Sequence, residues 1–283
     1  QLPGLTAVIG VGKVPDTLSW EELTAAVAPL EFAALPFDHP VYVLYSSGTT
    51  GVPKGIVHGA GGTLLQHLKE HLLHTDLHRD DRLFYFTTCG WMMWNWLVSG
   101  LASGATLVLY DGSPTQPDYT ALWRMADEEG ITVFGTSARF LAGLAKSGVR
   151  PRDACRLTSV RTVLSTGSPL APETFDYVYD AVKTDVQLSS ISGGTDIVAC
   201  FALGNPLLPV HRGELQCAAL GMAVEIFDAD GRPMARGRGE LVCTRPFPSQ
   251  PVGFWADTDG EKYRRAYFTR FPGVWAHGDY AER

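Results

Sequence analysis

Residues 45–55 read Tyr45-Ser46-Ser47-Gly48-Thr49-Thr50-Gly51-Val52-Pro53-Lys54-Gly55. The apolar run 41–44 comes directly before them and predicts a buried strand. Glycines allow backbone amides to approach a ligand closely, hydroxyl groups add donors, and one lysine supplies a positive charge. This strand and loop therefore predict a polyphosphate-binding site. The candidate residues are Ser46, Ser47, Gly48, Thr49, Thr50, Gly51 and Lys54.

The loop differs from a Walker A motif, which requires the pattern G-x-x-x-x-G-K-[ST]. Gly48 and Gly51 are too close together, and Gly55 follows Lys54 where Ser or Thr would stand. A flexible Gly/Ser linker is the structural alternative. The Pro-Lys-Gly sequence, in register with hydroxyl and glycine positions, disfavours that alternative.

Composition places the chain among globular proteins. It has 283 residues, of which 45% are hydrophobic and 19% charged, which suffices for one large or two small domains. The net charge of −7 disfavours nucleic acid as a partner, although a local site in an acidic protein can still bind an anionic nucleotide. The five cysteines are widely spaced without a C-x-x-C pair, so we expect free, buried thiols and a reducing, cytoplasmic location.

Two features at the ends and in the middle of the chain affect its interpretation. The chain starts at Gln1 without a signal-peptide pattern and stops at Arg283 with no visible end to its last element, so we expect a fragment. Residues 89–110 carry no charge and are long enough for a membrane span. Glycines interrupt this segment and its last part is β-like, so we expect a helix, a turn and a buried strand instead.

Predicted strands alternate with predicted helices over most of the chain, which indicates an α/β fold with a layered, mostly parallel sheet. The expected strands are 83–86, 106–109, 131–134 and 160–164, and the expected helices are 19–28, 64–73, 119–129, 137–146 and 173–182. After about residue 205 the helical periodicity fades, and strand-like runs at 223–227 and 240–244 flank a turn signal. We therefore expect an α/β core over 1–205 and a β-rich, barrel-like subdomain over 206–283.

Three further short motifs carry groups that suit a nucleotide. Gly167-Ser168-Pro169 follows an expected strand, where a Gly-Pro turn offers a flat backbone wall at the usual ligand crevice. In Ser192-Gly193-Gly194-Thr195-Asp196, the Thr195 hydroxyl can donate to a phosphate oxygen, and Asp196 is an oxygen ligand of the kind that Mg²⁺ takes. In His277-Gly278-Asp279, the carboxylate can accept from two vicinal hydroxyls. Alone, each motif is also typical of an ordinary turn or helix cap.

In this order, the loop and the three motifs resemble the signatures of the acyl-adenylate-forming enzymes, the AMP-dependent synthetase/ligase family. The resemblance runs from Leu2 to Arg283, and it is strongest to those members that ligate acetoacetate to CoA. It implies that the chain is part of the large N-terminal domain of such an enzyme, without the mobile C-terminal domain. It also implies small-molecule partners only, and it leaves the oligomeric state open.

The resemblance assigns roles to individual residues. Residues 46–54 would bind the β- and γ-phosphates of ATP, residues 167–169 the adenine, and Asp279 the ribose. Thr195 would contact the α-phosphate and the acyl carboxylate, and Asp196 would hold Mg²⁺, with Lys54 as the third catalytic residue. Two positions depart from the family pattern: Asp196 stands where Glu is usual, and Ser192 replaces an aromatic residue.

The acyl pocket is expected at Gly90-Trp91-Met92-Met93-Trp94-Asn95-Trp96, which could also be plain core packing. We select Trp91 and Met92 as its wall, together with Gly193 and Gly194. Acetate-using members carry Trp at the position of Gly193, so we expect open volume there, and a mild effect of Gly193→Ala. The alternative is that Gly193 supplies a positive φ. The implied reaction is an acid–thiol ligation that joins acetoacetate to CoA with ATP and Mg²⁺. The alternative is the same reaction with another short-chain acid in place of acetoacetate.

A further motif points to a different kind of site. The residues His67-Leu68-Lys69-Glu70-His71 fit the H-x-x-E-H pattern of zinc proteases. His74 and His78 extend it at helical spacing. A zinc hydrolase built on His67 and His71 is therefore an alternative function, and a partly exposed helix face is the structural alternative. A nucleotide-binding remnant without turnover is a third possibility.

Overall fold

The computed structural model describes residues 6–46 and 53–283. The predicted phosphate-loop residues Ser47, Gly48, Thr49, Thr50 and Gly51 lie outside the described residues. The chain divides into two compact units, Gln1–Pro36 and Phe37–Arg283.

The first unit contains two short paired strands, β1 (Ile9–Gly10) and β2 (Leu18–Ser19), and the helix α1 (Trp20–Thr24). The Ser19 hydroxyl accepts the Glu22 backbone N–H at 3.3 Å and so caps the helix at its N-terminus. The helix was expected to reach residue 28 but ends four residues earlier. It buries none of its residues, so no tertiary packing supports further turns.

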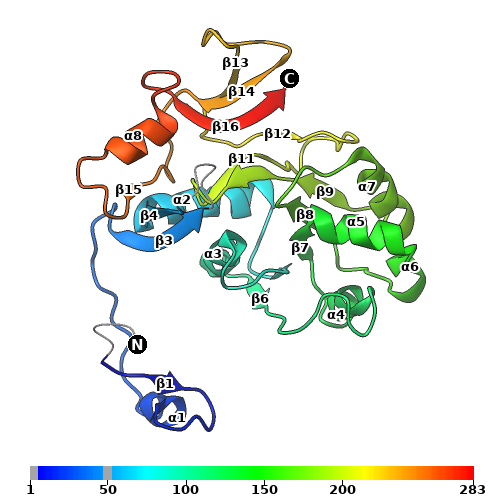
Figure 1. Cartoon of the computed structure of the whole chain (residues 1–283). Coiled ribbons are helices and arrows are strands. Elements are labelled where there is room, and N and C mark those ends of the chain that lie inside the picture. Colours follow the sequence, from blue (N-terminus) through cyan, green and yellow to red (C-terminus); the bar gives the residue numbers. More distant parts are fainter. Residues whose placement is uncertain (1–5, 47–52) are drawn as a thin grey trace. The chain divides into compact units, whose positions relative to one another are not determined.

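A five-stranded parallel sheet organises the second unit, and Figure 1 shows it in cyan and green. Its strands, in spatial order, are β6 (Thr106–Val108), β5 (Arg82–Tyr85), β7 (Val133–Ser137), β8 (Thr162–Thr166) and β9 (Gln187–Ser190). Each neighbouring pair is parallel. The predicted α/β class and the four predicted strands are therefore confirmed.

Both faces of this sheet are covered, as strand alternation requires. On one face, Phe84, Phe134 and Val163 pack with buried residues of α4 (Ala121–Glu128), α5 (Ala138–Ser147) and α7 (Pro172–Tyr177), which continues as a π-helical turn (Val178–Val182). On the other face, Leu83, Val133 and Leu164 pack with α3 (Met92–Ser99). A short helix, α6 (Pro151–Ala154), precedes β8.

The uncharged segment 89–110 is not a single helix. It forms α3, a 3₁₀ turn (Gly100–Ser103) and β6, as expected, although β6 is only partly buried because it is the edge strand. Among the described residues, no helix has the length and apolarity that crossing a membrane requires. All five cysteines are free; Cys155, Cys200 and Cys243 are buried, whereas Cys89 is exposed.

The strand predicted before the phosphate loop is β3 (Pro40–Ser46), and it pairs with β4 (Lys54–Gly59), which in turn pairs with β15 (Gly253–Phe254). The strand is confirmed, but its predicted burial is wrong: Val41 is 44% exposed and Val43 is 37% exposed. The reason is position, because β3 is the outer strand of this small antiparallel sheet and has a partner on one side only.

Two more antiparallel sheets follow the parallel sheet in sequence. One contains β10 (Ser192–Gly194), β11 (Ala199–Leu203) and β12 (Cys217–Ala218). The other contains β13 (Val224–Phe227), β14 (Arg238–Cys243) and β16 (Trp275–Glu282). They share a core with α8 (Glu261–Tyr267) around Phe201 and Trp275. The strands expected at 223–227 and 240–244 are confirmed, and the domain boundary near 205 stays a prediction.

Candidate functional site

The carboxyl ends of the parallel strands meet at one edge of the sheet and bring distant motifs together. At this edge β8 ends next to Gly167, which has a φ of +89°, and β5 leads toward Trp91. A Cβ placed on Gly167 would lie 3.4 Å from the Trp91 ring, so this motif and the aromatic cluster are in direct contact. Beyond β9 the chain enters β10 and then Thr195 and Asp196.

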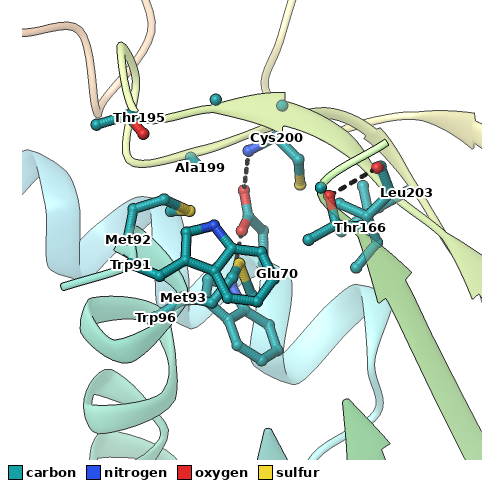
Figure 2. A pocket seen from close by; sticks show the side chains of 14 residues that line it. Glu70, Trp91, Met92, Met93, Trp96, Thr166, Thr195, Ala199, Cys200 and Leu203 are labelled. Atoms are coloured by element: carbon teal, nitrogen blue, oxygen red, sulfur yellow. Dashed lines mark hydrogen bonds between the residues drawn. The ribbon is translucent and has the colours of Figure 1, made fainter. Parts of the chain in front are cut away.

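These segments surround a cavity of about 100 Å³, shown in Figure 2. A cavity of this size holds several water-sized groups, so it suits a short acyl chain better than a long one. Six residues selected from the sequence line it: Gly167, Trp91, Met92, Gly193, Gly194 and Thr195. Met93 and Trp96, from the same aromatic motif as Trp91 and Met92, also line it. The sequence did not reveal the other lining residues, which are Glu70, Thr166, Ile191, Ala199, Cys200 and Leu203.

Lys54 and Asp196 form an ion pair next to this cavity. Lys54 Nζ lies 3.7 Å from Asp196 Oδ1, and the Tyr267 hydroxyl donates a hydrogen bond to the same oxygen. The Lys54 ammonium also lies 5.1 Å from the Tyr267 ring centroid, and that ring stacks on Trp275 at 3.8 Å. Burial, followed by the nearby Asp196 carboxylate, raises the pKa of Tyr267, so the phenol keeps its proton and remains a donor.

Asp196 fits the cation that its motif implies. Its second oxygen, Oδ2, makes no hydrogen bond within the described residues, so it remains available to a ligand. One carboxylate with phosphate oxygens and water is the donor set that Mg²⁺ usually takes. No group of three or more His, Cys, Asp or Glu side chains gathers as a metal site in the described part of the chain. The arrangement therefore suits a cation held jointly with a phosphate.

His277-Gly278-Asp279 forms a bulge in β16. The register between β14 and β16 shifts after Glu240, which leaves these residues outside the regular pairing. The Glu240 carboxylate, 1% exposed, accepts the Gly278 backbone N–H at 3.0 Å and pairs with Arg270 at 2.5 Å. The buried Glu240 carboxylate therefore fixes the backbone of the bulge at Gly278. Sequence inspection missed Glu240, because its partner lies 38 residues away.

The bulge approaches the Thr195 motif through His277. A Cβ placed on Gly194 would lie 3.2 Å from His277 Nε2, and the same nitrogen lies 3.6 Å from Asp279 Oδ2. Burial lowers the pKa of His277, although the nearby Asp196 and Asp279 carboxylates oppose this shift. Asp279 itself is 60% exposed, as is required of a group that binds a ligand from solvent.

The remaining predicted residues are less closely gathered. Ser46 pairs with Lys54 across β3 and β4, so the two residues flank the phosphate loop on both sides. Ser168 and Pro169 follow Gly167 and are exposed, beside the cavity rather than in its lining.

The volume argument for Gly193 is wrong. A Cβ at this position would lie 2.1 Å from the Ala199 carbonyl oxygen and 2.4 Å from Cys200 Cα, so strand backbone already fills the space. Gly193 also has no positive φ, which removes the alternative explanation. Gly193 instead permits the close approach of β10 and β11. We therefore expect Gly193→Ala to be disruptive rather than mild.

The histidine stripe does not form an exposed face or a zinc site. It lies on α2 (Ala60–Lys69) and the π-helical turn that follows (Glu70–His74), with His67, His71 and His74 at most 2% exposed. The three side chains bind backbone carbonyls: His67 that of Val198, His71 that of Trp96 and His74 that of Gly204. Hydrogen bonding to the core explains the stripe, and no metal cluster is found in residues 6–46 and 53–283.

The fold and these motifs define a class, and comparison of the sequence with known families confirms it. Residues 2–250 match the AMP-binding enzyme family, and the chain belongs to this family. The chain is 63% identical over 254 residues to an acetoacetyl-coenzyme A synthetase of Rhizobium meliloti (strain 1021), covering 90% of this chain and 39% of that protein. It is 52% identical over 279 residues to the acetoacetyl-CoA synthetase of Gallus gallus, covering 97% and 42%.

The fold has a solved counterpart in an acetoacetyl-CoA synthetase from Streptomyces lividans. The TM-score is 0.92 at 49% sequence identity, and the match covers 99% of this chain and 44% of that one. The expected membership of an adenylate-forming family is therefore confirmed. The chain spans about two fifths of the length of the relatives it matches.

Proposed function

We propose that the full-length protein carrying this chain activates acetoacetate with ATP and transfers the acetoacetyl group to CoA. A carboxylate oxygen of acetoacetate attacks the α-phosphorus of ATP, which releases pyrophosphate and leaves acetoacetyl-adenylate. The CoA thiol then attacks the acyl carbon, and AMP leaves as the thiol loses its proton. The observation that carries the proposal is a small cavity lined by Thr195, the residue that directly precedes Asp196 of the Lys54–Asp196 pair.

The chain's own residues would act mainly by position and charge in the first step. The Thr195 hydroxyl would donate to the α-phosphate and orient the acyl carboxylate. Lys54 would place its ammonium on the β- and γ-phosphates with the loop beginning at Ser46. Asp196 would hold Mg²⁺, which neutralises phosphate charge.

The nucleoside would be held by two other motifs. Gly167, Ser168 and Pro169 would form the backbone wall for the adenine, and Asp279 would accept hydrogen bonds from both ribose hydroxyls. Small-molecule substrates are the partners in this proposal, and we place the protein in the cytoplasm.

The test is a panel of short acids assayed for AMP release with the full-length protein, ATP, Mg²⁺ and CoA. We expect acetoacetate to give the highest kcat/KM, ahead of acetate, propionate and butyrate. If another acid gave a higher kcat/KM, the proposed reaction would stand, but that acid would be the substrate in place of acetoacetate. AMP release that no acid stimulates would overturn the proposal.

A further inference from the structure

The buried part of the cavity lining contains a carboxylate that the proposed reaction does not use. Glu70 is 1% exposed and lines the cavity together with Trp96, Cys200 and Leu203, each at most 4% exposed. Thr195, by contrast, lies in the partly exposed part of the lining, with Gly193 and Gly194. An acid with its reacting carboxylate at Thr195 would therefore direct its distal group toward Glu70.

Glu70 joins two opposite walls of the cavity, as Figure 2 shows. Its Oε2 accepts the Trp96 indole N–H at 2.9 Å from α3, and its Oε1 accepts the Cys200 backbone N–H at 3.4 Å from β11. On its own helix, Gln66 Nε2 and Lys69 Nζ donate to Oε1 at 3.1 and 3.5 Å. All four neighbours are donors, as suits an ionised carboxylate.

Lys69 is the one neighbour of Glu70 within the described residues whose charge opposes that of the carboxylate. His67 and His71 lie on the same helix, and burial lowers the pKa of both, that of His71 to about 3, so they are neutral at pH 7. The Cys200 thiol is also neutral, because burial and then the Glu70 carboxylate raise its pKa. Lys69 is the one cation within 4 Å of Glu70 among the described residues, and it does not line the cavity.

We propose that Glu70 is a specificity residue of the acyl pocket: its buried carboxylate rejects acids with a second negative charge at the distal end and admits acids whose distal group is neutral. This inference rests on the proposed activation of a short acid at Thr195. Like charges brought together in a site of low dielectric repel strongly, so a single carboxylate can discriminate without a steric barrier.

Three acids of nearly the same shape separate charge from size. Acetoacetate, malonamate and malonate differ only in the distal substituent on the second carbonyl, which is methyl, amino or oxide. The measurement is kcat/KM for each acid in AMP release by the full-length protein. We expect the wild type to use the two neutral acids and to use malonate poorly.

In Glu70→Gln we expect the malonate-to-acetoacetate ratio of kcat/KM to rise by about tenfold or more, while the malonamate-to-acetoacetate ratio stays within about threefold. Glu129→Gln removes an exposed carboxylate and is the matched control, with both ratios unchanged. An unchanged malonate ratio in active Glu70→Gln overturns the inference. An equal rise for malonamate also overturns it, because the pocket would then have changed shape.

Lys69→Gln provides an independent test, and it decides the matter if Glu70→Gln does not fold. Removing the cation should strengthen the field of Glu70 and lower the malonate ratio; an unchanged ratio contradicts the inference. A different result would overturn the proposed function itself, namely a wild-type protein that activates none of the acids. If the wild type activates acetoacetate but the malonate-to-acetoacetate ratio of kcat/KM does not change in the variants, only the proposed role of Glu70 is overturned.

Discussion

Asp196 is the residue on which the proposed chemistry depends most. Its Oδ1 accepts a hydrogen bond from the Tyr267 hydroxyl and lies 3.7 Å from Lys54 Nζ. Its second oxygen has no hydrogen-bond partner among the described residues. The resemblance of its motif to the family pattern gave Asp196 a role. Tyr267 belongs to no such motif, so the sequence did not predict that it would contact Asp196. The two residues lie 71 positions apart, and only folding brings the phenol to the carboxylate.

We expect Asp196→Asn to weaken adenylation at limiting Mg²⁺ by at least tenfold, because an amide oxygen is nearly isosteric but carries no charge for the cation. The measurement is the Mg²⁺ dependence of AMP release, with thermal unfolding as the control for folding. Near-normal activity at limiting Mg²⁺ would remove Asp196 from the cation site.

We expect Gly193→Ala to destabilise the protein by roughly 2 kcal/mol or more, because the new Cβ must displace strand backbone rather than a flexible side chain. Gly253→Ala is the matched control, since a Cβ at Gly253 meets nothing within 4 Å. Denaturant unfolding of both variants is the measurement. Equal stability of the two would contradict the backbone contact at Gly193.

At the scale of elements, α2 and its π-helical turn reverse the usual pattern of burial. Leu64, Leu65, Leu72 and Leu73 are between 40% and 55% exposed, whereas the polar side chains between them are buried. Helical periodicity predicted the helix correctly, but periodicity cannot tell which of two faces meets the core when leucine and histidine repeat at the same spacing. Hydrogen bonds to α3 and β11 decide this in favour of the polar face.

The buried histidines should make the protein sensitive to acid. Burial lowers the pKa of His71 to about 3, below its unfolded value of 6.5, so between these pH values the unfolded chain binds more protons. The stabilisation is complete above about pH 6.5 and is lost as the pH falls toward 3. We expect His71→Gln to reduce the slope of unfolding free energy against pH by up to about 1.4 kcal/mol per pH unit.

Denaturant unfolding between pH 7 and 4 measures this slope. A His71→Gln slope equal to that of the wild type would show that His71 does not titrate with folding.

The bulge in β16 gives a second prediction at this scale. Glu240→Gln keeps an acceptor for the Gly278 N–H but loses the charge that pairs with Arg270. We expect KM for ATP to rise by roughly three- to tenfold with a smaller change in KM for the acid, since one buried charged hydrogen bond is weakened. Equal changes in both KM values would mean that Glu240 does not position the bulge that we propose for ribose binding.

At the scale of the molecule, the sequence predicts the parallel sheet because its buried strands are short apolar runs separated by periodic helices. It also predicts that motifs following those strands converge, since parallel strands end at one edge. Residues of β11 escaped notice because this strand is a short, fully buried run directly after a motif. Glu70 escaped because a charged helical residue ordinarily faces solvent.

We propose above all that this chain provides the site at which acetoacetate is joined to AMP. Acetoacetate-dependent exchange of labelled pyrophosphate into ATP, measured with the full-length protein without CoA, isolates that step. We predict exchange that requires Mg²⁺ and acetoacetate and that falls at least tenfold in Asp196→Asn. Exchange that is absent, or that proceeds equally well without acetoacetate, would contradict the claim.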